Sequence, residues 1–388
     1  MWKEIRRIFI GEEEIMKTID LNFDKKISEE EERMIGFASE KIISYDITDN
    51  SVSLTLTDDS DSEMICKKLK QLISGKGIIY KPEVYASNVM CKNYFGMNVI
   101  TESEIIKKYE DGSVVLNDTG IRLFSCFDQL CLGIVEKFNP IRKKYPTIIP
   151  ISVLYKTNYL ATSPQYIHLC STFDETIDEY QQAQELYTQD SLTEIMKKPK
   201  YALSPSACFH LYQELKNQII PKPVIYTMRQ NVFRNEGRFN WTDLSRLRDY
   251  NVREIVFIGD HEFVDTIRTK IMETTADLFR ELGMSFSIIS TSDPFIMPEM
   301  QRYRNIQRRQ KVKYELQLNN NKSHRTACAS YNLHGVAFSG KFNFNIEGIE
   351  VTESGCVGFG LERIVIAFLN QFGMNQNNWP RLIRENIK

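Results

Sequence analysis

Two stretches of the sequence carry residue types that suit the binding of a nucleotide. In Ser354-Gly355-Cys356-Val357-Gly358-Phe359-Gly360-Leu361-Glu362-Arg363, Gly358 and Gly360 leave bare backbone for a flat ligand, and Arg363 begins the polar side of an apolar helix. The second stretch is Val232-Phe233-Arg234-Asn235-Glu236, followed by Arg246-Leu247-Arg248-Asp249-Tyr250. An arginine offers a permanently charged fork of donors, which suits the charge that grows on a phosphate during displacement.

Each of these residues also has a purely structural interpretation. Arg234 could pair with a neighbouring carboxylate, and Arg363 could form a salt bridge on a helix surface. Tyr250, taken alone, is more typical of a protein core. These residues therefore indicate nucleotide binding only when the two stretches are considered together.

The composition is that of an ordinary globular chain. It has 388 residues, of which 26% are charged and 42% hydrophobic, enough for a large core and two domains. The sequence has no apolar run of about 18 residues and no signal-peptide core, so we expect a cytoplasmic protein without a membrane partner. Eight irregularly spaced cysteines do not indicate a disulfide scaffold, although a minority could hold a metal.

Charge is distributed unevenly along the chain. Residues 1–118 hold about 16 Lys and Arg against about 23 Asp and Glu, a net charge of roughly −7, which leaves the remainder near +5. Nucleic-acid affinity comes mainly from Lys and Arg that release counterions from phosphates. The acidic composition of residues 1–118 therefore argues against a tRNA-binding role for that region.

Hydrophobic periodicity predicts a small α/β domain over residues 1–118, with no evident chemistry. A strand is expected at Lys17 to Phe23, and a helix at Ser28 to Ile42 that begins with a capping box of Ser28 and Glu31. Strands at Tyr45 to Thr48 and Ser51 to Thr57 and a helix at Asp61 to Gly75 complete the pattern.

Residues 119–388 read as a second domain with long helices and a hairpin. Helices are expected at Gly120 to Phe138, His210 to Gln218 and Glu262 to Leu282. The stretch Ile225 to Ile258 alternates as a two-stranded hairpin with a polar loop. Further strands are expected at Met284 to Ser290, Val312 to Leu318 and Thr326 to Leu333.

The two arginine-bearing stretches resemble motifs 2 and 3 of the class II aminoacyl-tRNA synthetase catalytic domain. The resemblance implies an α+β fold, with an antiparallel sheet flanked by helices after the small N-terminal α/β domain. It also implies that ATP is a substrate. The resemblance assigns phosphate binding to three arginines: Arg234 would contact the α-phosphate, Arg363 the γ-phosphate, and Arg246 is a weaker candidate. It places Glu236 near the adenine and the Tyr250 ring over the base.

Three further residues match the zinc ligands of the atypical, methanogen-type seryl-tRNA synthetases. They are Cys208 in Ser-Pro-Ser-Ala-Cys-Phe, Glu254 at the end of the hairpin and Cys356 just before motif 3. Each cysteine alone is more often a buried small hydrophobe. Three protein ligands leave one tetrahedral position open, which is typical of a catalytic Zn²⁺ site. In that family the open position takes the α-amino group of the substrate.

The later part of the sequence resembles the amino acid:[carrier protein] ligases, which are homologues of those synthetases. One short polar stretch joins Asp293 to Lys313, leaving little space for the helical insertion of the seryl enzymes. Asn332 and His334 border the expected amino-acid pocket, where either could contact substrate or support it, and Glu315 could bind substrate or pair with Lys313.

Two features depart from the family pattern. The ligases generally lack a sizeable N-terminal domain, so residues 1–118 are unexplained. Thr326 stands where seryl enzymes place a Mg²⁺-binding glutamate, and Glu315 and Glu350 are possible substitutes. Mg²⁺ is nevertheless expected to screen the leaving pyrophosphate.

The resemblance implies a ligase that activates a small amino acid as an aminoacyl-adenylate. The preferred acceptor is the phosphopantetheine thiol of a carrier protein, with tRNA less favoured. One alternative is a zinc-dependent seryl-type aminoacyl-tRNA synthetase that uses the N-terminal module for tRNA. Another is a non-catalytic regulator that binds amino acids, although such a module has no need for phosphate-binding arginines. Class II domains usually pair through motif 1, so a homodimer is expected.

Overall fold

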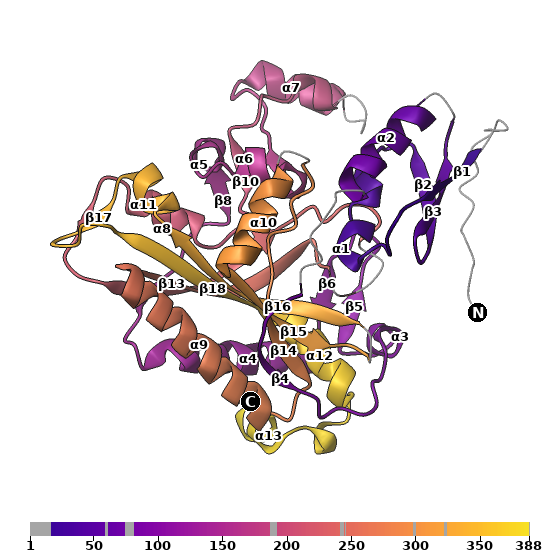
Figure 1. The fold of residues 1–388 in the computed structure, drawn as a ribbon. Helices are drawn as coiled ribbons and strands as arrows, with labels where there is room; N and C mark the ends of the chain where they lie inside the picture. Colours follow the sequence, from indigo (N-terminus) through magenta and orange to yellow (C-terminus); the bar gives the residue numbers. More distant parts are fainter. Residues whose placement is uncertain are drawn as a thin grey trace. The chain divides into compact units, whose positions relative to one another are not determined.

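The computed structural model describes residues 17–58, 61–73, 81–186, 192–240, 244, 246–297, 300–321 and 324–387 (Figure 1). The chain forms two compact units that divide between Tyr80 and Lys81. The expected boundary at 118/119 lies inside the second unit. The reason is that β4 (Val84–Asn88) pairs with β14 (Phe286–Ser290) in the main sheet of that unit.

The N-terminal unit is a three-stranded antiparallel sheet with helices. Its strands β1 (Lys17–Asn22), β2 (Ile42–Thr48) and β3 (Ser51–Leu56) lie in the order β1-β3-β2. Helix α2 (Ser62–Ile73) buries Ile65, Leu69 and Ile73, which recur every four residues along one face. Ser74 and Gly75, at the end of the expected helix, lie outside the described residues.

The first helix of this unit is shorter than the sequence predicts. The capping box of Ser28 and Glu31 is present, but α1 (Glu29–Glu32) makes one turn only, and a 3₁₀ turn follows at Ile35–Phe37. Gly36 lies in that turn and is a poor helix former. The next strand then begins at Ile42, where the helix was expected to end.

An eight-stranded sheet forms the centre of the second unit (Figure 1). Its strand order is β4-β14-β15-β16-β18-β13-β12-β7, and every pairing is antiparallel except that of β12 with β7. The remaining strands of this sheet are β7 (Ile141–Lys143), β12 (Val224–Phe233), β13 (Asp249–Gly259), β15 (Lys313–Asn319), β16 (Arg325–Gly335) and β18 (Glu353–Gly360).

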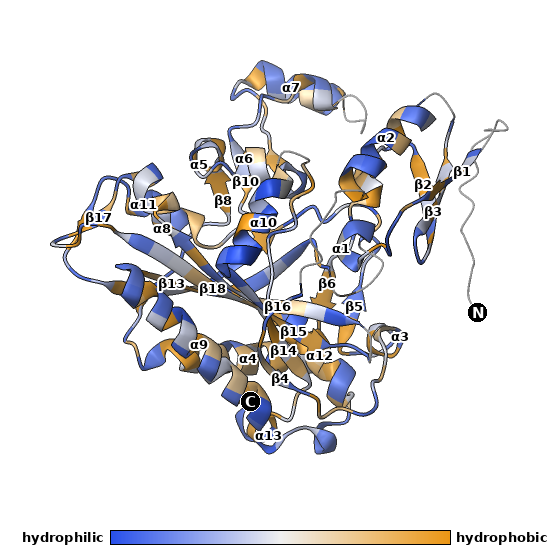
Figure 2. Ribbon diagram, in the orientation of Figure 1, coloured by the Kyte–Doolittle hydropathy of each residue, from blue (hydrophilic) through white to orange (hydrophobic). Residues whose placement is uncertain are grey.

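Alternation along the central strands sends side chains into two separate cores. Ile255, Phe257 and Val357 belong to the larger core, whereas Val256 and Cys356 belong to the smaller one. Because successive strand residues point to opposite faces, these two cores lie on opposite faces of the sheet. Helices α4 (Asp118–Glu136), α9 (His261–Glu281) and α12 (Leu361–Phe372) contribute to the larger core, and Figure 2 shows apolar residues gathered where α12 meets the sheet.

The smaller core is covered by short elements. Helices α8 (Phe209–Glu214) and α11 (Ala337–Phe342) pack together there, and the Tyr212 ring stacks on Phe338 with ring centroids 4.2 Å apart. A small sheet, β8 (Ile148–Pro150), β9 (Leu169–Cys170) and β10 (Tyr201–Leu203), contributes Ile149 and Ala202. This face also receives Cys208 and Cys356.

Shorter elements connect these layers. They are α3 (Met97–Thr101), β5 (Ile106–Lys108), β6 (Val114–Leu116), α5 (Ile151–Lys156), α6 (Tyr159–Thr162), α7 (Ile177–Glu185), β11 (Ile219–Ile220), α10 (Gln301–Gln310), β17 (Asn345–Ile346) and α13 (Arg381–Asn386). No helix within the described ranges combines the length and the apolarity needed to cross a bilayer.

Candidate functional site

The three predicted metal ligands meet on the face of the sheet that carries the smaller core. Cys208 immediately precedes α8, Glu254 lies on β13 and Cys356 lies on the adjacent strand β18. One potential ligand atom from each lies within 4.8 Å of the other two, and all three residues are buried. We call these residues the ligand cluster. Metal binding itself stays a prediction.

Gly358 makes room for the carboxylate of this cluster. It pairs with Glu254 across β18 and β13, and a Cβ atom at position 358 would lie 2.7 Å from Glu254 Oε2. Real Cβ atoms essentially never approach another heavy atom that closely. The glycine in motif 3 therefore has a local steric role, because it lets the carboxylate lie over the neighbouring backbone.

The cluster lacks a compensating charge of its own. Burial raises the pKa of the Glu254 carboxyl to about 7, although hydrogen bonds with the two cysteines oppose this change. A hydrogen bond with Cys208, together with burial, raises the pKa of the Cys356 thiol well above its usual range. A cation could replace these protons, and two thiolates with one carboxylate fit the ligand preferences of Zn²⁺.

Two of the predicted substrate-binding residues contact the cluster. His334 Nε2 lies 3.3 Å from Cys356 Sγ, and the Asn332 side-chain amide donates to the same sulfur at 3.5 Å. Burial lowers the pKa of His334 to about 4. In this geometry both residues support Cys356, and their contact with substrate stays a prediction.

The five predicted ATP-binding residues also come together, and we call them the arginine cluster. The buried Glu236 carboxylate accepts hydrogen bonds from Arg246 and Arg363, each at 3.3 Å. The Arg363 guanidinium lies 4.3 Å from the centre of the Tyr250 ring, and the Arg234 guanidinium lies 5.9 Å from it. The ring expected to cover an adenine therefore packs against arginine.

Arg363 and Arg234 differ in how they are held. Arg363 lies in the first turn of α12 and is only 6% exposed, and its Nε is a buried atom without a hydrogen-bond partner. Arg234 Nε donates to the Pro205 carbonyl at 3.1 Å, close in sequence to Cys208. The Arg234 charge also acts to lower the pKa of Glu254, so this arginine adjoins both clusters.

Glu315 forms the ion pair with Lys313 that was one of its two expected roles, and Lys313 also pairs with Asp293, which was not a candidate site residue. Glu315 lies 3.4 Å from the Lys313 ammonium, which forms a shorter 2.7 Å bond with Asp293. The only sequence signal was the strand alternation of Lys313 and Glu315 with Tyr314 and Leu316, which places two charges on one strand face.

A magnesium site is not evident at the positions considered. Thr326 is buried and bonds to Asn320, and Glu350 is exposed in a loop. Among the described residues, the three potential ligands that lie close enough together to share one metal ion are those of the ligand cluster. Mg²⁺ coordination by protein side chains stays a prediction.

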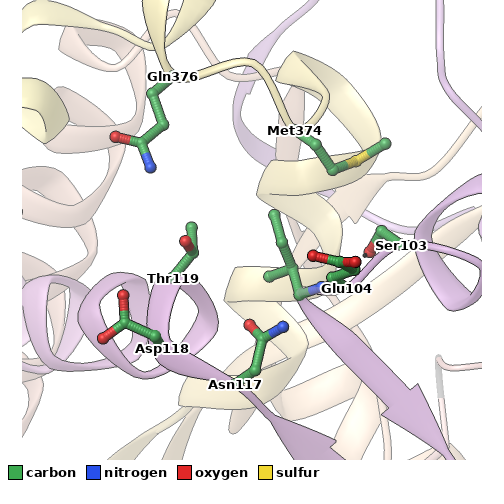
Figure 3. Close-up of a pocket in the computed structure, with 8 residues that line it drawn as sticks. Ser103, Glu104, Asn117, Asp118, Thr119, Met374 and Gln376 are labelled. Carbon is green, nitrogen blue, oxygen red and sulfur yellow. Dashed lines mark hydrogen bonds between the residues drawn. The ribbon is translucent and has the colours of Figure 1, made fainter.

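A separate cavity of about 510 Å³ lies away from both clusters. Figure 3 shows its side chains around an open space between the start of α4 and the segment that follows α12. Its lining residues are Ser103, Glu104, Ile105, Asn117, Asp118, Thr119, Met374 and Gln376. None of them was a candidate site residue.

Comparison with known proteins identifies the same region of the chain. The family model described as tRNA synthetase class II core domain (G, H, P, S and T) matches residues 192–372. A type-2 serine–tRNA ligase of Methanococcus aeolicus is 29% identical over 282 residues, which cover 69% of this chain and 54% of that protein. The chain thus spans about half the length of such curated relatives.

A second kind of relative is matched over more of its own length. Amino acid–[acyl-carrier-protein] ligase 1 of Bradyrhizobium diazoefficiens is 26% identical over 246 residues, which cover 62% of this chain and 74% of that protein. The sequence comparisons therefore include both of the enzyme classes that the motifs resemble.

Solved structures share the fold. The SerRS of M. kandleri, solved in complex with A. aeolicus tRNASec, superposes with a TM-score of 0.71 at 20% identity and covers 96% of this chain and 77% of that one. The cytoplasmic serine–tRNA ligase of Naegleria fowleri, solved with AMP, gives a TM-score of 0.60 at 8% identity and covers 84% of this chain and 71% of that one. The chain thus contains a class II tRNA synthetase core domain, close to the methanogen-type serine–tRNA ligases and to an amino acid–carrier-protein ligase.

Proposed function

We propose that the chain uses ATP to activate a small amino acid as an aminoacyl-adenylate and then transfers the aminoacyl group to an acceptor. The observation that carries this proposal is the meeting of Cys208, Glu254 and Cys356 within 4.8 Å, beside an arginine cluster whose member Arg234 bonds to the Pro205 carbonyl and faces the Tyr250 ring. Holding both reactants in one site is the main source of rate in such a displacement.

The two clusters would have different roles, one in binding the amine of the amino acid and the other in binding the phosphates of ATP. The ligand cluster would hold Zn²⁺, which when bound can offer its open position to the substrate amine. Arg234 would then face the α-phosphate, where negative charge grows as the amino-acid carboxylate oxygen attacks phosphorus and pyrophosphate leaves. Arg363 and Arg246 would neutralise the leaving group, together with the Mg²⁺ that accompanies ATP.

Glu236 would keep these arginines in position before ATP arrives. Its buried carboxylate accepts one hydrogen bond from each of Arg246 and Arg363, which fixes two long side chains. Charge-assisted hydrogen bonds of this kind are about twice as strong as neutral ones. No covalent enzyme nucleophile is needed in this scheme, so the cysteines serve as ligands only.

Transfer RNA is our preferred acceptor, which reverses the preference drawn from the sequence alone. The relatives include several type-2 serine–tRNA ligases, and the M. kandleri protein with the similar fold was solved with a tRNA. The second candidate acceptor is a carrier-protein thiol. It is favoured by the Bradyrhizobium relative and by the short stretch from Asp293 to Lys313, which contains the ten-residue helix α10.

Two assays test this proposal in order. Amino-acid-dependent exchange of pyrophosphate into ATP should occur with at least one small amino acid, in protein purified with zinc. If none of the twenty amino acids supports exchange, activation is wrong and the non-catalytic regulator is the better interpretation.

The acceptor is tested next with radiolabelled amino acid. We expect acid-stable product on total tRNA, and a homodimer by light scattering. Product only on a phosphopantetheinylated carrier protein would contradict the tRNA assignment and restore the carrier-protein ligase. Activity on neither acceptor, with exchange intact, would contradict both acceptor assignments.

A further inference from the structure

Polar side chains lie against the sulfur atoms of both cysteines in the ligand cluster. The Ser206 hydroxyl lies 3.3 Å from Cys208 Sγ. The Asn332 side-chain amide and His334 Nε2 lie 3.5 and 3.3 Å from Cys356 Sγ. Serine and histidine can donate or accept at such contacts, whereas the amide nitrogen of an asparagine can only donate. At least one contact therefore brings a hydrogen-bond donor to a sulfur of the cluster.

Other cysteines of the chain have different surroundings. Cys126 and Cys131 of α4 are buried among the apolar side chains of the larger core. Cys91 Sγ donates to the Asn93 carbonyl oxygen at 2.9 Å, as a protonated thiol does. A thiolate, by contrast, accepts charge-assisted hydrogen bonds, which are about twice as strong as neutral ones. The polar groups around the cluster therefore suit sulfur atoms that carry negative charge, which is the form that binds a metal ion.

The sheet fixes the position of Asn332. This residue pairs with Cys356 across β16 and β18, and residues paired in this way project from the same face. The Asn332 amide nitrogen also donates to the Ser330 hydroxyl at 3.2 Å, so both of its hydrogens have an acceptor. The amide is therefore oriented toward the sulfur by the strand and by a second hydrogen bond.

A break in the pairing of the same two strands directs His334. The register of β16 and β18 shifts between Leu333 and Gly335, which leaves His334 as an extra residue. A bulge of this kind re-aims a side chain. The imidazole packs edge-on against the Phe338 ring, with ring centroids 4.9 Å apart, and its Nε2 contacts Cys356 Sγ. Backbone and neighbouring ring together hold the histidine beside the sulfur.

Ser206 belongs to the loop that leads into α8, two residues before Cys208. Its backbone carbonyl accepts a 2.9 Å hydrogen bond from the hydroxyl of Ser204, which is fully buried. This bond anchors the loop beside the cluster. The Ser206 hydroxyl can then rotate to donate to the Cys208 sulfur, because the orientation of a hydroxyl hydrogen adapts to its partner.

The lone pairs on sulfur show how these groups fit a metal-bound cluster. A thiolate sulfur has three lone pairs, of which one binds the metal ion. Asn332 and His334 can donate to the two that remain on Cys356, and Ser206 can donate to one of the two on Cys208. Hydrogen bonds around metal-bound ligands orient those ligands and change how much charge they pass to the ion.

We propose that Ser206, Asn332 and His334 are positioning residues that donate hydrogen bonds to the two cysteine sulfurs and so strengthen metal binding at the ligand cluster. This inference rests on the proposed function, because it needs a metal ion at the cluster. Its effects are measurable in metal binding alone, in the full-length chain and without amino acid or ATP.

Zinc affinity, measured by competition with a chromophoric chelator, provides the first test. Ser206→Ala and Asn332→Leu should each raise Kd for zinc about 10-fold, because each sulfur loses a donor. Ser206→Thr keeps the hydroxyl and should recover the wild-type affinity. The matched control is Ser87→Ala at an exposed position of the edge strand β4, which should bind zinc as the wild-type chain does.

A pair of substitutions tests His334. His334→Leu should raise Kd for zinc about 10-fold, whereas His334→Gln keeps an N–H group near the position of Nε2 and should bind zinc almost as tightly as the wild-type chain. X-ray absorption of the zinc-bound proteins should show the same number of nitrogen ligands in both variants and in the wild-type chain. Loss of one nitrogen ligand in His334→Leu would show that the imidazole binds the metal directly, and would overturn its role as a donor to sulfur.

Cobalt in place of zinc gives a signal that a merely structural role would not move. Charge-transfer absorption from thiolate to Co²⁺ falls in energy when the sulfur loses a hydrogen bond, because its electrons are then held less tightly. We expect these bands to shift to longer wavelength in Ser206→Ala and Asn332→Leu. Wild-type zinc affinity together with unshifted bands in both variants would overturn the proposal, even if both variants melt at a lower temperature.

Failure of this proposal can be told apart from failure of the proposed function. A wild-type chain that binds zinc but supports no pyrophosphate exchange overturns the proposed function only, and the affinities of the variants still decide the role of the donors. A wild-type chain that binds neither zinc nor cobalt overturns the donors together with the ligand cluster. If Asn332→Leu does not fold, Ser206→Ala, which removes one hydroxyl from a loop, decides the question.

Discussion

The ligand cluster and the arginine cluster both contain a residue of β13, Glu254 and Tyr250 respectively, but they differ in how their charges are paired. Cys208, Glu254 and Cys356 bring three potential anions within 4.8 Å of one another. In the arginine cluster, by contrast, the buried Glu236 is shared by Arg246 and Arg363, so these two guanidinium groups have an anionic partner within the protein. The first cluster needs a cation from outside to replace its protons, whereas the second holds its own ion pairs and keeps a net positive charge that suits the phosphates of ATP.

This difference indicates how each region meets its ligand. The ligand cluster keeps protons on acidic groups whose pKa is raised, and a cation must displace them. In the arginine cluster, the phosphates of ATP must compete with Glu236 for two guanidinium groups that already have a partner. Changes in the two regions should therefore affect different measurements.

The largest expected effect comes from removing one metal ligand. Cys356→Ala should lower the rate of amino-acid-dependent exchange about 1000-fold, because the substrate amine loses its partner. The bound zinc, measured by mass spectrometry, should fall from one per chain to near zero. Cys131→Ala changes a cysteine buried in α4 and is the control that should keep its zinc. An equal zinc content in Cys356→Ala and Cys131→Ala would show that Cys356 is not a metal ligand.

The pH dependence of stability should also separate the regions. Burial raises the folded-state pKa of Glu254 to about 7, above the value of 4.5 that is usual for a glutamate. The folded metal-free chain therefore retains a proton that the unfolded chain releases. Stability from this group is full below pH 4.5 and is lost as the pH rises through about 7, by up to about 3 kcal/mol.

Urea unfolding of the metal-free chain at pH 5 and pH 8 measures this loss. Glu254→Gln should show a smaller difference between the two pH values than the wild-type chain does. An identical difference in both proteins would mean that Glu254 titrates normally in the folded state. Zinc should reverse the trend in the wild-type chain, because it binds better as the protons leave.

Removing an arginine should leave the metal in place. Arg363→Gln is expected to lower exchange about 100-fold and to raise KM for ATP, because one phosphate partner is lost. Its zinc content should remain one per chain, and Arg363→Lys should recover little because it lacks the planar fork. Loss of zinc from Arg363→Gln would show that the clusters are not separate.

How far the sequence alone predicts this arrangement depends on the range of the contacts. The expected helices at Gly120 to Phe138 and Glu262 to Leu282 correspond to α4 and α9 with ends shifted by one or two residues, because their apolar periodicity is local. The helix expected at His210 to Gln218 is shorter, since α8 ends at Glu214. The meeting of Cys208, Glu254 and Cys356 could be anticipated only through resemblance to a known family.

Contacts set by distant pairing could not be predicted. The boundary at 118/119 failed because β4 pairs with β14, about 200 residues later, and no local pattern records that partner. The ion pair of Lys313 with Asp293 was not predicted for a similar reason, because Asp293 lies in the loop after β14 and Lys313 begins the next strand, β15. Individual charged residues on a strand more often face solvent than a ligand.

The smallest effect expected here comes from filling the space beneath Glu254. Gly358→Ala adds a Cβ that would lie 2.7 Å from the carboxylate oxygen, and should destabilise the fold by about 1–3 kcal/mol and weaken zinc binding. Gly340→Ala is the matched control, because a Cβ there meets nothing within 4 Å, and it should be neutral or slightly stabilising. Equal melting temperatures for the two variants would contradict the steric role of Gly358.

Zinc titration of the metal-free chain, followed by amino-acid-dependent pyrophosphate exchange, tests the central claim most directly. We predict that exchange is absent without metal, rises in proportion to added zinc and saturates at one equivalent per chain. Full exchange in the metal-free chain, or zinc bound at one equivalent with no exchange for any amino acid, would contradict the account.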